Sequence, residues 1–299
     1  MNATGYKSGF FSIVGCPNVG KSTLLNRLVG QKIAIVTDRA QTTRNRITGV
    51  LTRKDYQMIF LDTPGMTRPR NKLGTFMQKT AEDASKDVEA ILLVIDALRG
   101  VGERDADVMR FLKTQRSPVI VLLNKCDAAS AAQMQDVREA VKAAGFETML
   151  AVSAKTGENV DRLEALLKDY LTEGPQYYPE DMVTDQPERV ICAELIREKT
   201  LELLREEIPH GIGVGIDKMQ LRPDGALMDV WATIYCERES HKGIIIGRGG
   251  SMLKRIGSEA RKEIEWLLDV RVNLQLWIKV KEDWRNRQQM LNELGYRDD

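Results

Sequence analysis

The sequence predicts an α/β protein with two domains: a mostly parallel, helix-covered sheet followed by a smaller α/β unit. A chain of 299 residues is long enough for two hydrophobic cores. From residue 10 to about residue 171, short apolar runs alternate with longer segments of helical periodicity. This alternation is typical of a parallel sheet with helices on both faces. Beyond residue 188 the order of the elements changes, which indicates the second unit.

The first domain is expected to hold five buried strands separated by amphipathic helices. Apolar runs predict strands at 10–14, 57–62, 90–96, 118–124 and 148–153. Apolar residues spaced i, i+3, i+4 predict helices at 21–29, 105–113, 134–144 and 160–171. Residues 47–62 resemble a hairpin, which would place one antiparallel strand in the sheet.

A proline-containing segment is expected to separate the two domains. Residues 172–188 hold three prolines and no hydrophobic period, as linkers commonly do. The predicted domains are therefore 1–173 and 189–299, with a linker at 174–188. Elements of the second domain follow in the order helix, two strands, two helices and strand, at 189–208, 212–222, 226–236, 241–246, 251–268 and 270–281.

Composition argues against several classes of protein. The four cysteines have no CxxC spacing, which argues against a zinc site and against a disulfide framework. The longest apolar runs are too short to span a membrane, and the first residues show no signal peptide. We therefore expect a cytoplasmic protein. The formal net charge of +1 identifies no partner, because local patches can cancel in the sum.

A phosphate-binding loop is predicted between the first strand and the first helix. The segment GCPNVGKS at 15–22 has the spacing of such loops, a glycine and four residues before Gly-Lys-Ser. Backbone N–H groups cradle phosphate oxygens there. Lys21 would act on the β- and γ-phosphates, and the Ser22 hydroxyl would bind Mg²⁺. The nucleotide-binding residues predicted here are Gly15, Cys16, Pro17, Asn18, Val19, Gly20, Lys21 and Ser22.

Two motifs at strand ends identify the base as guanine. NKCD follows the strand 118–124, and the Asp127 carboxylate can accept hydrogen bonds from guanine N1–H and the 2-amino group. Adenine has neither donor, so a site of this kind rejects it. SAK follows the next strand and would place the Ala154 N–H near guanine O6. The base-binding residues predicted are Asn124, Lys125, Asp127, Ser153, Ala154 and Lys155.

The motif DTPG and an upstream threonine pair are expected to sense the γ-phosphate. Asp62 would hold Mg²⁺ through water, and Gly65 would offer its N–H to the γ-phosphate. Thr43, favoured over Thr42, would place its hydroxyl on Mg²⁺ when a mobile loop closes; a solvated loop is the alternative. Asp62, Thr63, Pro64, Gly65 and Met66 complete the predicted nucleotide site. The Mg²⁺ ligands predicted are Ser22, Thr43 and Asp62.

A second glycine loop predicts a different ligand. GIIIGRGG at 243–250 fits I-G-x-x-G, the loop with which KH domains clamp about four nucleotides of single-stranded RNA. The order of elements around it matches a type II KH domain. Residues 238–262 include seven basic and two acidic side chains, as a phosphate-tracking groove requires. The alternative is a glycine turn beside a solvated basic helix. The RNA-binding residues predicted are Lys242, Ile246, Gly247, Arg248, Gly249, Gly250, Lys254 and Arg255, with Ile244 and Ile245 joining Ile246 in an apolar floor for the bases.

These motifs resemble a known family. GCPNVGKS, TTRNRITG and DTPG resemble the bacterial translation-factor-related GTPases. NKCD, SAK and the C-terminal domain narrow the resemblance to the Era family of ribosome-assembly GTPases, from residue 10 to about residue 296. The resemblance implies a P-loop GTPase domain joined to a type II KH domain. It also implies binding to the 3′ end of 16S-type small-subunit ribosomal RNA, during maturation of the small ribosomal subunit.

The resemblance also bears on how GTP would be hydrolysed to GDP and phosphate. Lys21, Thr43 and Gly65 would be the catalytic residues. Met66 stands where Ras-like proteins carry a water-orienting glutamine, and a thioether is a poor acceptor, so slow intrinsic hydrolysis is expected. Related GTPases with this substitution use K⁺ held partly by an asparagine that matches Asn18. Here Asn18 either holds K⁺ or braces the loop.

Two other functions remain open from the sequence. In one, the chain is an RNA-binding protein for which the nucleotide is only a structural ligand. In the other, a GTPase acts on membranes or partner proteins, with the KH unit as a contact module. Trp277 and Trp284 lie among basic residues, which suits a membrane surface, whereas the strand period through Lys281 favours packing roles. Era-like proteins are associated with the membrane periphery, so weak contact with the inner face of the cell membrane is retained. A monomer is expected.

Overall fold

The computed structural model describes residues 5–39, 41–204 and 211–297. The chain forms two compact units. The first unit comprises residues 1–34, 43–69 and 77–185, and the second comprises 35–42, 70–76 and 186–299. Each unit has its own core. No helix among the described residues is long and apolar enough to cross a membrane.

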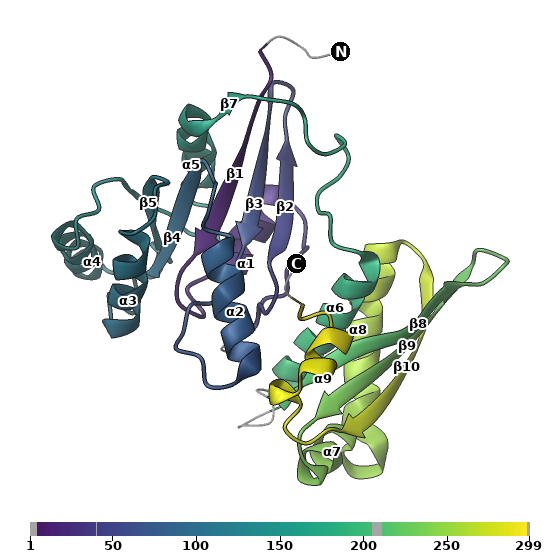
Figure 1. The fold of residues 1–299 in the computed structure, drawn as a ribbon. Helices are drawn as coiled ribbons and strands as arrows, with labels where there is room; N and C mark the ends of the chain where they lie inside the picture. The colour runs from purple at the N-terminus through teal and green to yellow at the C-terminus, as the bar shows by residue number, and fades with distance from the viewer. Residues whose placement is uncertain (1–4, 40, 205–210, 298–299) are drawn as a thin grey trace. The chain divides into compact units, whose positions relative to one another are not determined.

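The first unit is built on a sheet in the order β2-β3-β1-β4-β5-β6, with β7 pairing with β1 (Figure 1). All pairs on the main path are parallel except the antiparallel pair β2–β3, which confirms the predicted hairpin. The last predicted strand is shorter than expected. The strands are β1 (Lys7–Val14), β2 (Ile47–Thr52), β3 (Tyr56–Asp62), β4 (Ala90–Asp96), β5 (Val119–Asn124), β6 (Met149–Ala151) and β7 (Thr172–Glu173).

Register brings the carboxyl ends of four strands to one edge of this sheet. Asp62 pairs with Ile13 at the end of β1, and Asn124 pairs with Asp96 at the end of β4. The loops that carry the predicted motifs therefore leave the sheet at the same edge. This is where ligands bind in open α/β sheets.

Four helices follow the predicted periodicity, and one was not predicted. The four are α1 (Lys21–Val29), α3 (Glu103–Leu112), α4 (Ala131–Ala143) and α5 (Val160–Leu167), the last continued by η1 (Lys168–Tyr170). The additional helix is α2 (Lys72–Asp83). Its buried side chains Leu73, Met77 and Ala81 form only a narrow stripe, which is a weaker periodic signal than a full amphipathic face.

The proline-containing segment belongs to the first unit as far as residue 185. The side-chain oxygen of Gln57 accepts hydrogen bonds from the backbone N–H groups of Tyr177 and Tyr178, at 2.9 and 3.0 Å. Farther along, the Val50 N–H donates to the Val183 carbonyl at 2.8 Å. These contacts secure most of the predicted linker along the sheet edge.

The second unit has the predicted αββααβ order. Its three-stranded sheet runs β10-β9-β8, with β9 antiparallel to β8 and parallel to β10. Helices α6 and α8 pack on one face of it. The elements are α6 (Glu188–Leu203), β8 (Gly213–Leu221), β9 (Leu227–Cys236), α7 (Glu239–Ile246), η3 (Arg248–Gly250), α8 (Ser251–Leu268) and β10 (Arg271–Val280). The end of the predicted helix 189–208 lies outside the described residues.

After β10 the chain continues through η4 (Trp284–Asn286) and α9 (Gln288–Glu293), neither of which was predicted. Trp284 is fully buried, donates from Nε1 to the Gly211 carbonyl at 2.9 Å, and stacks on Tyr296. The expected packing role is therefore correct for Trp284. Trp277 on β10 is 44% exposed and packs only partly, against the ring of Trp231.

Residues 35–42 pack inside the second unit although they lie far from it in the sequence. Ile35 is part of that unit's hydrophobic core. The Val36 N–H donates to Glu198 Oε1 at 2.8 Å, and Arg39 Nη2 donates to the Leu204 carbonyl at 3.1 Å. Arg197, fully buried on α6, donates to the Thr42 carbonyl. The segment immediately before Thr43 is thus anchored on α6.

Candidate functional site

The loop 15–22 joins β1 to α1, and glycine is required at two of its positions. Gly15 and Gly20 have φ angles of 152° and 100°, which L side chains rarely adopt. A Cβ atom on Gly20 would lie 2.3 Å from the Asn124 side chain, and one on Gly15 would lie 2.5 Å from the Val94 carbonyl. The sequence motif therefore follows from close packing at both ends of the loop.

Lys21, at the start of α1, folds back over this loop. Its Nζ donates to the carbonyls of Gly15 and Cys16, at 3.2 and 3.0 Å. The side chain is buried, and burial lowers its pKa, while the nearby Asp62 carboxylate opposes that shift. The ammonium is therefore held inside the loop that the motif predicted for phosphate.

The three predicted Mg²⁺ ligands lie together. Ser22 Oγ donates to Asp62 Oδ2 at 2.6 Å and lies 2.8 Å from Thr43 Oγ1. Thr43 Oγ1 is itself 3.5 Å from Asp62 Oδ2. Burial raises the pKa of Asp62 to about 6, against the opposing effects of Lys21 and the two hydroxyls. Asp62 Oδ1 is buried with no hydrogen-bond partner among the described residues.

These residues fit a hard divalent cation. Mg²⁺ prefers oxygen ligands and binds proteins through few carboxylates. Two hydroxyl oxygens and one carboxylate converge here, and the second carboxylate oxygen, Asp62 Oδ1, still needs a partner. A hydrated cation would supply that partner through a bound water and offset the cost of burying the charge.

The segment 63–66 lies against the phosphate loop. A Cβ atom on Gly65 would come within 2.8 Å of Pro17, so only glycine fits this approach. The Met66 N–H donates to the Gly15 carbonyl at 3.2 Å, and Thr63 Oγ1 donates to the Ile13 carbonyl at 2.8 Å. Pro64 lies between these anchors and is buried. The Met66 side chain is buried in the core, where a thioether cannot orient water.

Asn124 acts as a clamp between two predicted loops. Its Nδ2 donates to the Val19 carbonyl at 2.7 Å, and its Oδ1 accepts from the Ala154 N–H at 2.9 Å. A guanine O6 bound here would have to share the Ala154 N–H with Asn124 Oδ1, or replace that oxygen as its acceptor. Ser153 is buried and its Oγ accepts from the Thr156 N–H at 3.1 Å.

Other members of the predicted base site are more open. Asp127 is exposed after β5, and no hydrogen bond to its carboxylate is seen in the described part of the chain. Lys155 is exposed too, and its carbonyl accepts from Arg27 at the end of α1. Arg27 also donates to the Ala154 carbonyl at 3.3 Å. No motif in the sequence pointed to Arg27.

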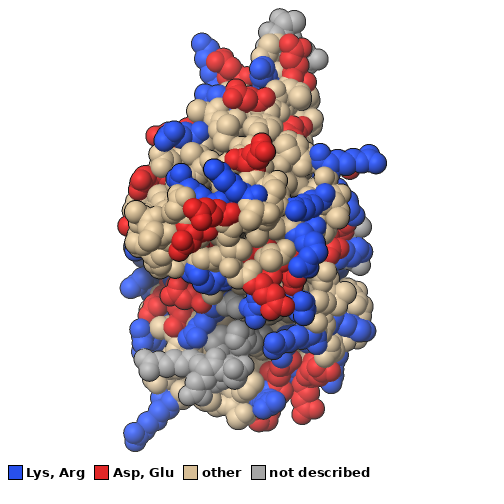
Figure 2. All heavy atoms as spheres, turned by 90° about the vertical axis from the view of Figure 1, so that its left-hand side faces the viewer, with Lys and Arg blue, Asp and Glu red and all other residues tan. Residues whose placement is uncertain are grey.

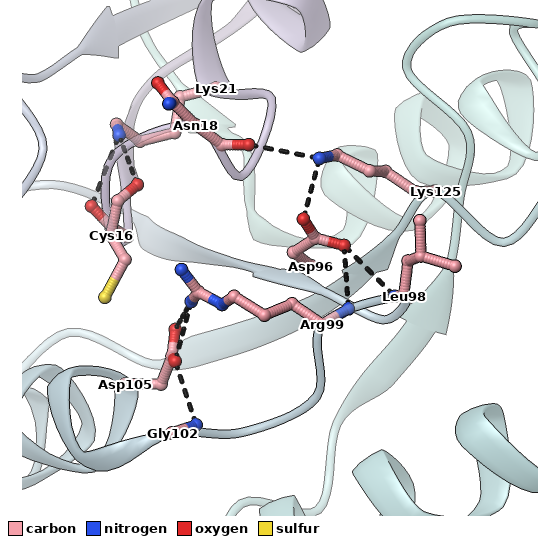
Figure 3. Close-up of polar contacts among 10 residues, drawn as sticks. Cys16, Asn18, Lys21, Asp96, Leu98, Arg99, Gly102, Asp105 and Lys125 are labelled. Carbon is pink, nitrogen blue, oxygen red and sulfur yellow. Dashed lines mark hydrogen bonds and ion pairs between the residues drawn. The ribbon is translucent and has the colours of Figure 1, made fainter. Parts of the chain in front are cut away.

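Asp96 is a site residue that the sequence analysis missed. Figure 3 shows Lys125 between Asp96 and Asn18: its Nζ lies 2.7 Å from Asp96 Oδ2 and 3.2 Å from the Asn18 carbonyl. Asp96 Oδ1 also accepts from the N–H groups of Leu98 and Arg99, at 3.0 and 3.3 Å. One ammonium therefore links the NKCD motif to the phosphate loop. Because Asp96 lies far from both motifs in the sequence, only its place at the end of a strand could have suggested it.

Near Cys16 of the phosphate loop, the buried carboxylate of Asp105 pairs with the partly exposed side chain of Arg99. Arg99 Nη2 donates to both oxygens of Asp105, at 2.9 and 2.7 Å, and the Gly102 N–H donates to Asp105 Oδ2 at 3.0 Å (Figure 3). Burial and the adjacent Asp105 carboxylate raise the pKa of the Cys16 thiol to about 11. Cys16 is therefore a protonated packing residue at neutral pH.

The second glycine loop connects α7 to α8 through η3. Gly247, Gly249 and Gly250 have φ angles of 72°, 59° and 79°, so three glycines lie in the left-handed region. A Cβ atom on Gly247 would approach Met252 to 2.7 Å, whereas one on Gly249 would meet nothing within 4 Å. Open space at Gly249 is what a loop that clamps a nucleic-acid backbone needs.

The apolar floor expected beside this loop is partly wrong. Ile245 is fully buried in the core, and Ile244 is 50% exposed. Ile246 lies between these extremes at the end of α7. A helix turns successive side chains about the axis, so three consecutive isoleucines cannot share one surface. Ile246 remains in the candidate site.

Basic side chains surround the loop. Arg248 and Lys254 are exposed and pair with no carboxylate among the described residues. Arg255 pairs with Glu259 at 3.0 Å. Lys242 lies 3.9 Å from Glu239. On the face of the molecule that Figure 2 shows, Lys and Arg side chains alternate with Asp and Glu.

Comparisons with known proteins follow the same division of the chain. Residues 10–125 match the family described as 50S ribosome-binding GTPase, and residues 207–285 match the KH domain family. A crystal structure of Era with MgGDPNP and nucleotides 1506–1542 of 16S ribosomal RNA superposes with a TM-score of 0.94, at 39% identity, and covers 97% of this chain and 99% of that chain. Era from Aquifex aeolicus bound to GDP·AlF4⁻ gives a TM-score of 0.93, at 40% identity, with 97% and 99% covered.

The similarity to curated relatives covers nearly the whole chain. GTPase Era of Staphylococcus haemolyticus is 47% identical, covering 99% of this chain and of its own. GTPase Era of Clostridioides difficile is 51% identical, covering 98% of this chain and 99% of its own. The chain belongs to the GTPase Era family.

Proposed function

We propose that this chain binds and hydrolyses GTP and binds single-stranded RNA through its KH domain, in maturation of the small ribosomal subunit. The observation that carries the proposal is the convergence of Ser22, Thr43 and Asp62 beside Lys21, with Asp62 Oδ1 left without a partner. Family membership supports the reaction, because the relatives are GTPases.

Mg²⁺ is the proposed metal, held by Ser22 and Thr43 directly and by Asp62 through water. It would neutralise charge on the β- and γ-phosphates. The Era structure that contains MgGDPNP supports this assignment. Lys21 would leave the carbonyls of Gly15 and Cys16 for the γ-phosphate, because a phosphate oxygen is a stronger acceptor than a carbonyl.

Hydrolysis would rest on positioning and charge stabilisation by Lys21, Thr43 and Gly65. Met66 cannot serve as a general base or orient water, since its thioether is buried in the core. A slow intrinsic rate follows.

K⁺ remains a proposal at Asn18. Asn18 has a positive φ of 64°, and its carbonyl accepts from Lys125 at 3.2 Å, which supports bracing of the loop. Its side chain could still bind K⁺ beside the phosphates. Phosphate release measured in potassium and in sodium salts, at equal ionic strength, separates the two roles: only the K⁺ role predicts faster release in potassium.

The proposed RNA is the 3′ end of 16S-type ribosomal RNA, held at the loop 247–250 with Lys242, Ile246, Lys254 and Arg255 alongside. The Era structure that contains nucleotides 1506–1542 supports this choice. Small residues let the sugar-phosphate backbone approach, and the basic side chains track its phosphates.

Phosphate release by the purified chain tests the catalytic part. Release should require Mg²⁺ and should be lost in the variant Lys21→Ala, which removes the ammonium from the loop. Sequencing of RNA that copurifies with the chain tests the second part. If phosphate release depends on Mg²⁺ but the copurifying RNA is not enriched in the 16S 3′ end, the chain is a GTPase with another partner.

A further inference from the structure

The sheet of the second unit has two different faces. Val230, Ala232 and Ile234 of β9 are buried in the core beneath the helices. Because successive side chains of a strand point to opposite faces, Trp231 and Thr233 lie on the other face. We call this second face the open face. It comprises Lys218 of β8, the odd-numbered residues from Asp229 to Tyr235 of β9, and the odd-numbered residues from Arg271 to Lys279 of β10.

Part of the open face is covered by the C-terminal segment. A side chain at Gly213 would meet Leu294 and Trp284, so η4 and the end of α9 lie over this end of β8. The C-terminal segment leaves two tryptophans farther along the sheet partly exposed. Trp231 is 37% exposed and Trp277 is 44% exposed.

The two tryptophans form an ordered aromatic surface. Their rings are 6.0 Å apart and inclined at 65°. Lys218 faces Trp231 across the β8–β9 ladder and places its Nζ 4.8 Å from the centre of that ring. Trp231 is on the central strand and Trp277 on its parallel neighbour, so the backbone of two paired strands fixes both rings.

The open face carries basic side chains at both ends of β10. Arg271 and Lys279 of β10 are exposed, and neither pairs with a carboxylate within the described part of the chain. Two carboxylates of this face accept hydrogen bonds. Asp229 is paired with Arg222 at 2.9 Å and accepts from Asn273 at 2.8 Å. Asp217, which lies in the β8 irregularity, accepts from Thr233 Oγ1 at 2.7 Å.

We propose that the open face is a second RNA-binding surface, on which bases of single-stranded RNA stack against Trp231 and Trp277. Lys279 and Arg271 contact the phosphates on either side. Aromatic side chains on the central strands of a sheet are a known means of stacking unpaired bases. The charges complement a polyanion, and the site is separate from the glycine loop between α7 and α8.

The surroundings of the two rings favour RNA over a lipid surface. Gln275 lies directly across from Trp231, and Thr233 lies across from Trp277. An amide beside a ring can pair with a base edge, whereas insertion into a bilayer requires a continuous apolar surface. Both tryptophans also lie within paired strands, where the hydrogen-bonded backbone fixes the positions of their Cα atoms.

Photocrosslinking tests the surface directly. The full chain, saturated with GDP or a non-hydrolysable GTP analogue, is irradiated with an unstructured oligouridylate of about 10 nucleotides that carries 4-thiouridine, a length within the range bound by single-strand sites. We expect adducts on the peptides that contain Trp231 and Trp277. The oligouridylate should also quench tryptophan fluorescence in the variant Gly249→Asp, whose glycine loop is blocked.

Substitutions measure the contribution of each ring. Trp277→Leu and Trp231→Leu should each weaken binding of the oligouridylate by about 5- to 150-fold, the range of one stacked base. Lys279→Glu keeps both rings and should weaken binding and lower its salt dependence. The matched control is Trp266→Leu, because Trp266 is 66% exposed on α8, away from the open face. Circular dichroism and GDP affinity check that each variant is folded.

The outcomes separate this inference from the proposed function. Loss of all RNA binding in Gly249→Asp, with wild-type affinity in both open-face tryptophan variants, would overturn the second surface and leave the glycine loop intact as the RNA site. Failure of the wild-type chain to bind any RNA would instead remove the proposed RNA function. Binding to phosphatidylglycerol vesicles that depends on Trp277, without any effect on oligouridylate, would assign the open face to a membrane and overturn the inference.

Discussion

Lys125 Nζ lies 2.7 Å from Asp96 Oδ2 and 3.2 Å from the carbonyl of Asn18, so one ammonium joins the end of β4 to the phosphate loop. Lys125 itself has a left-handed backbone, with φ at 66°. Strain of this kind persists only where surrounding contacts fix it. Asp96 is therefore a positioning residue for the base-binding loop.

The variant Asp96→Asn should release GDP about tenfold faster, because a hydrogen bond to a charged group contributes about 1.5 kcal/mol. Stopped-flow dissociation of a fluorescent GDP measures this rate. Asp83→Asn is the matched control, since Asp83 pairs with Lys86 on the surface at the same 2.7 Å. A double-mutant cycle with Lys125→Met decides the mechanism: if the two effects simply add, Asp96 does not act through Lys125.

Base preference is expected to change in Asp127→Asn. An amide can donate to the 2-oxygen of xanthine, whereas a carboxylate only accepts, so the variant should prefer xanthosine triphosphate to GTP. Competition of both nucleotides for the same site gives the ratio. Asp136→Asn, an exposed substitution on α4, serves as control. If the variant kept the wild-type preference for GTP over xanthosine triphosphate, the assignment of Asp127 to the guanine site would be wrong.

Gly249→Asp should abolish RNA binding at the glycine loop with little effect on folding. A Cβ atom there meets nothing within 4 Å, and aspartate tolerates the φ of 59°. The new carboxylate repels phosphate. Gly243→Asp on α7 is the matched control, since its Cβ would also meet nothing within 4 Å. Equal loss of affinity in both variants would mean that general charge, and not the loop, is responsible.

RNA affinity should differ between the GTP-bound and GDP-bound forms. Thr43, the predicted γ-phosphate sensor, directly follows a segment anchored on α6 through Glu198, Leu204 and Arg197. Ordering of Thr43 with GTP would pull on those anchors. A typical coupling is about 1–3 kcal/mol, or roughly 5- to 150-fold, and RNA must shift nucleotide preference by the same factor.

Titration of one short RNA against both nucleotide forms, at fixed salt, measures this coupling. Arg39→Ala removes the hydrogen bond to the Leu204 carbonyl without touching either ligand site, and should reduce the ratio of the two affinities. Arg53→Ala, which breaks an exposed pair with Glu164, should leave the ratio unchanged. Equal RNA affinities in both forms of the wild type would show two independent binding sites.

The features that could be predicted from the sequence are those formed by contiguous residues. The phosphate loop, the strand-end motifs and the αββααβ order each occupy contiguous residues, and their spacing reflects backbone geometry. Asp96 and Arg27 were missed because their roles depend on partners 29 and 127 or more residues away. The same limit explains the predicted linker, whose hydrogen bonds run to Gln57 and Val50 on distant strands. Ile245 was misplaced because a short helix divides neighbouring isoleucines between core and surface.

The discontinuous second unit restricts how this protein can be divided. Two short segments, 35–42 and 70–76, belong to it although they are inserted between elements of the first. A fragment that ends at residue 185 would keep these segments but lose α6, leaving Ile35 without its core. Exposure of one such side chain costs about 1.5–3 kcal/mol. Exchange of the C-terminal half with another lineage would therefore require matching changes in these two insertions, so the two halves are expected to be inherited together.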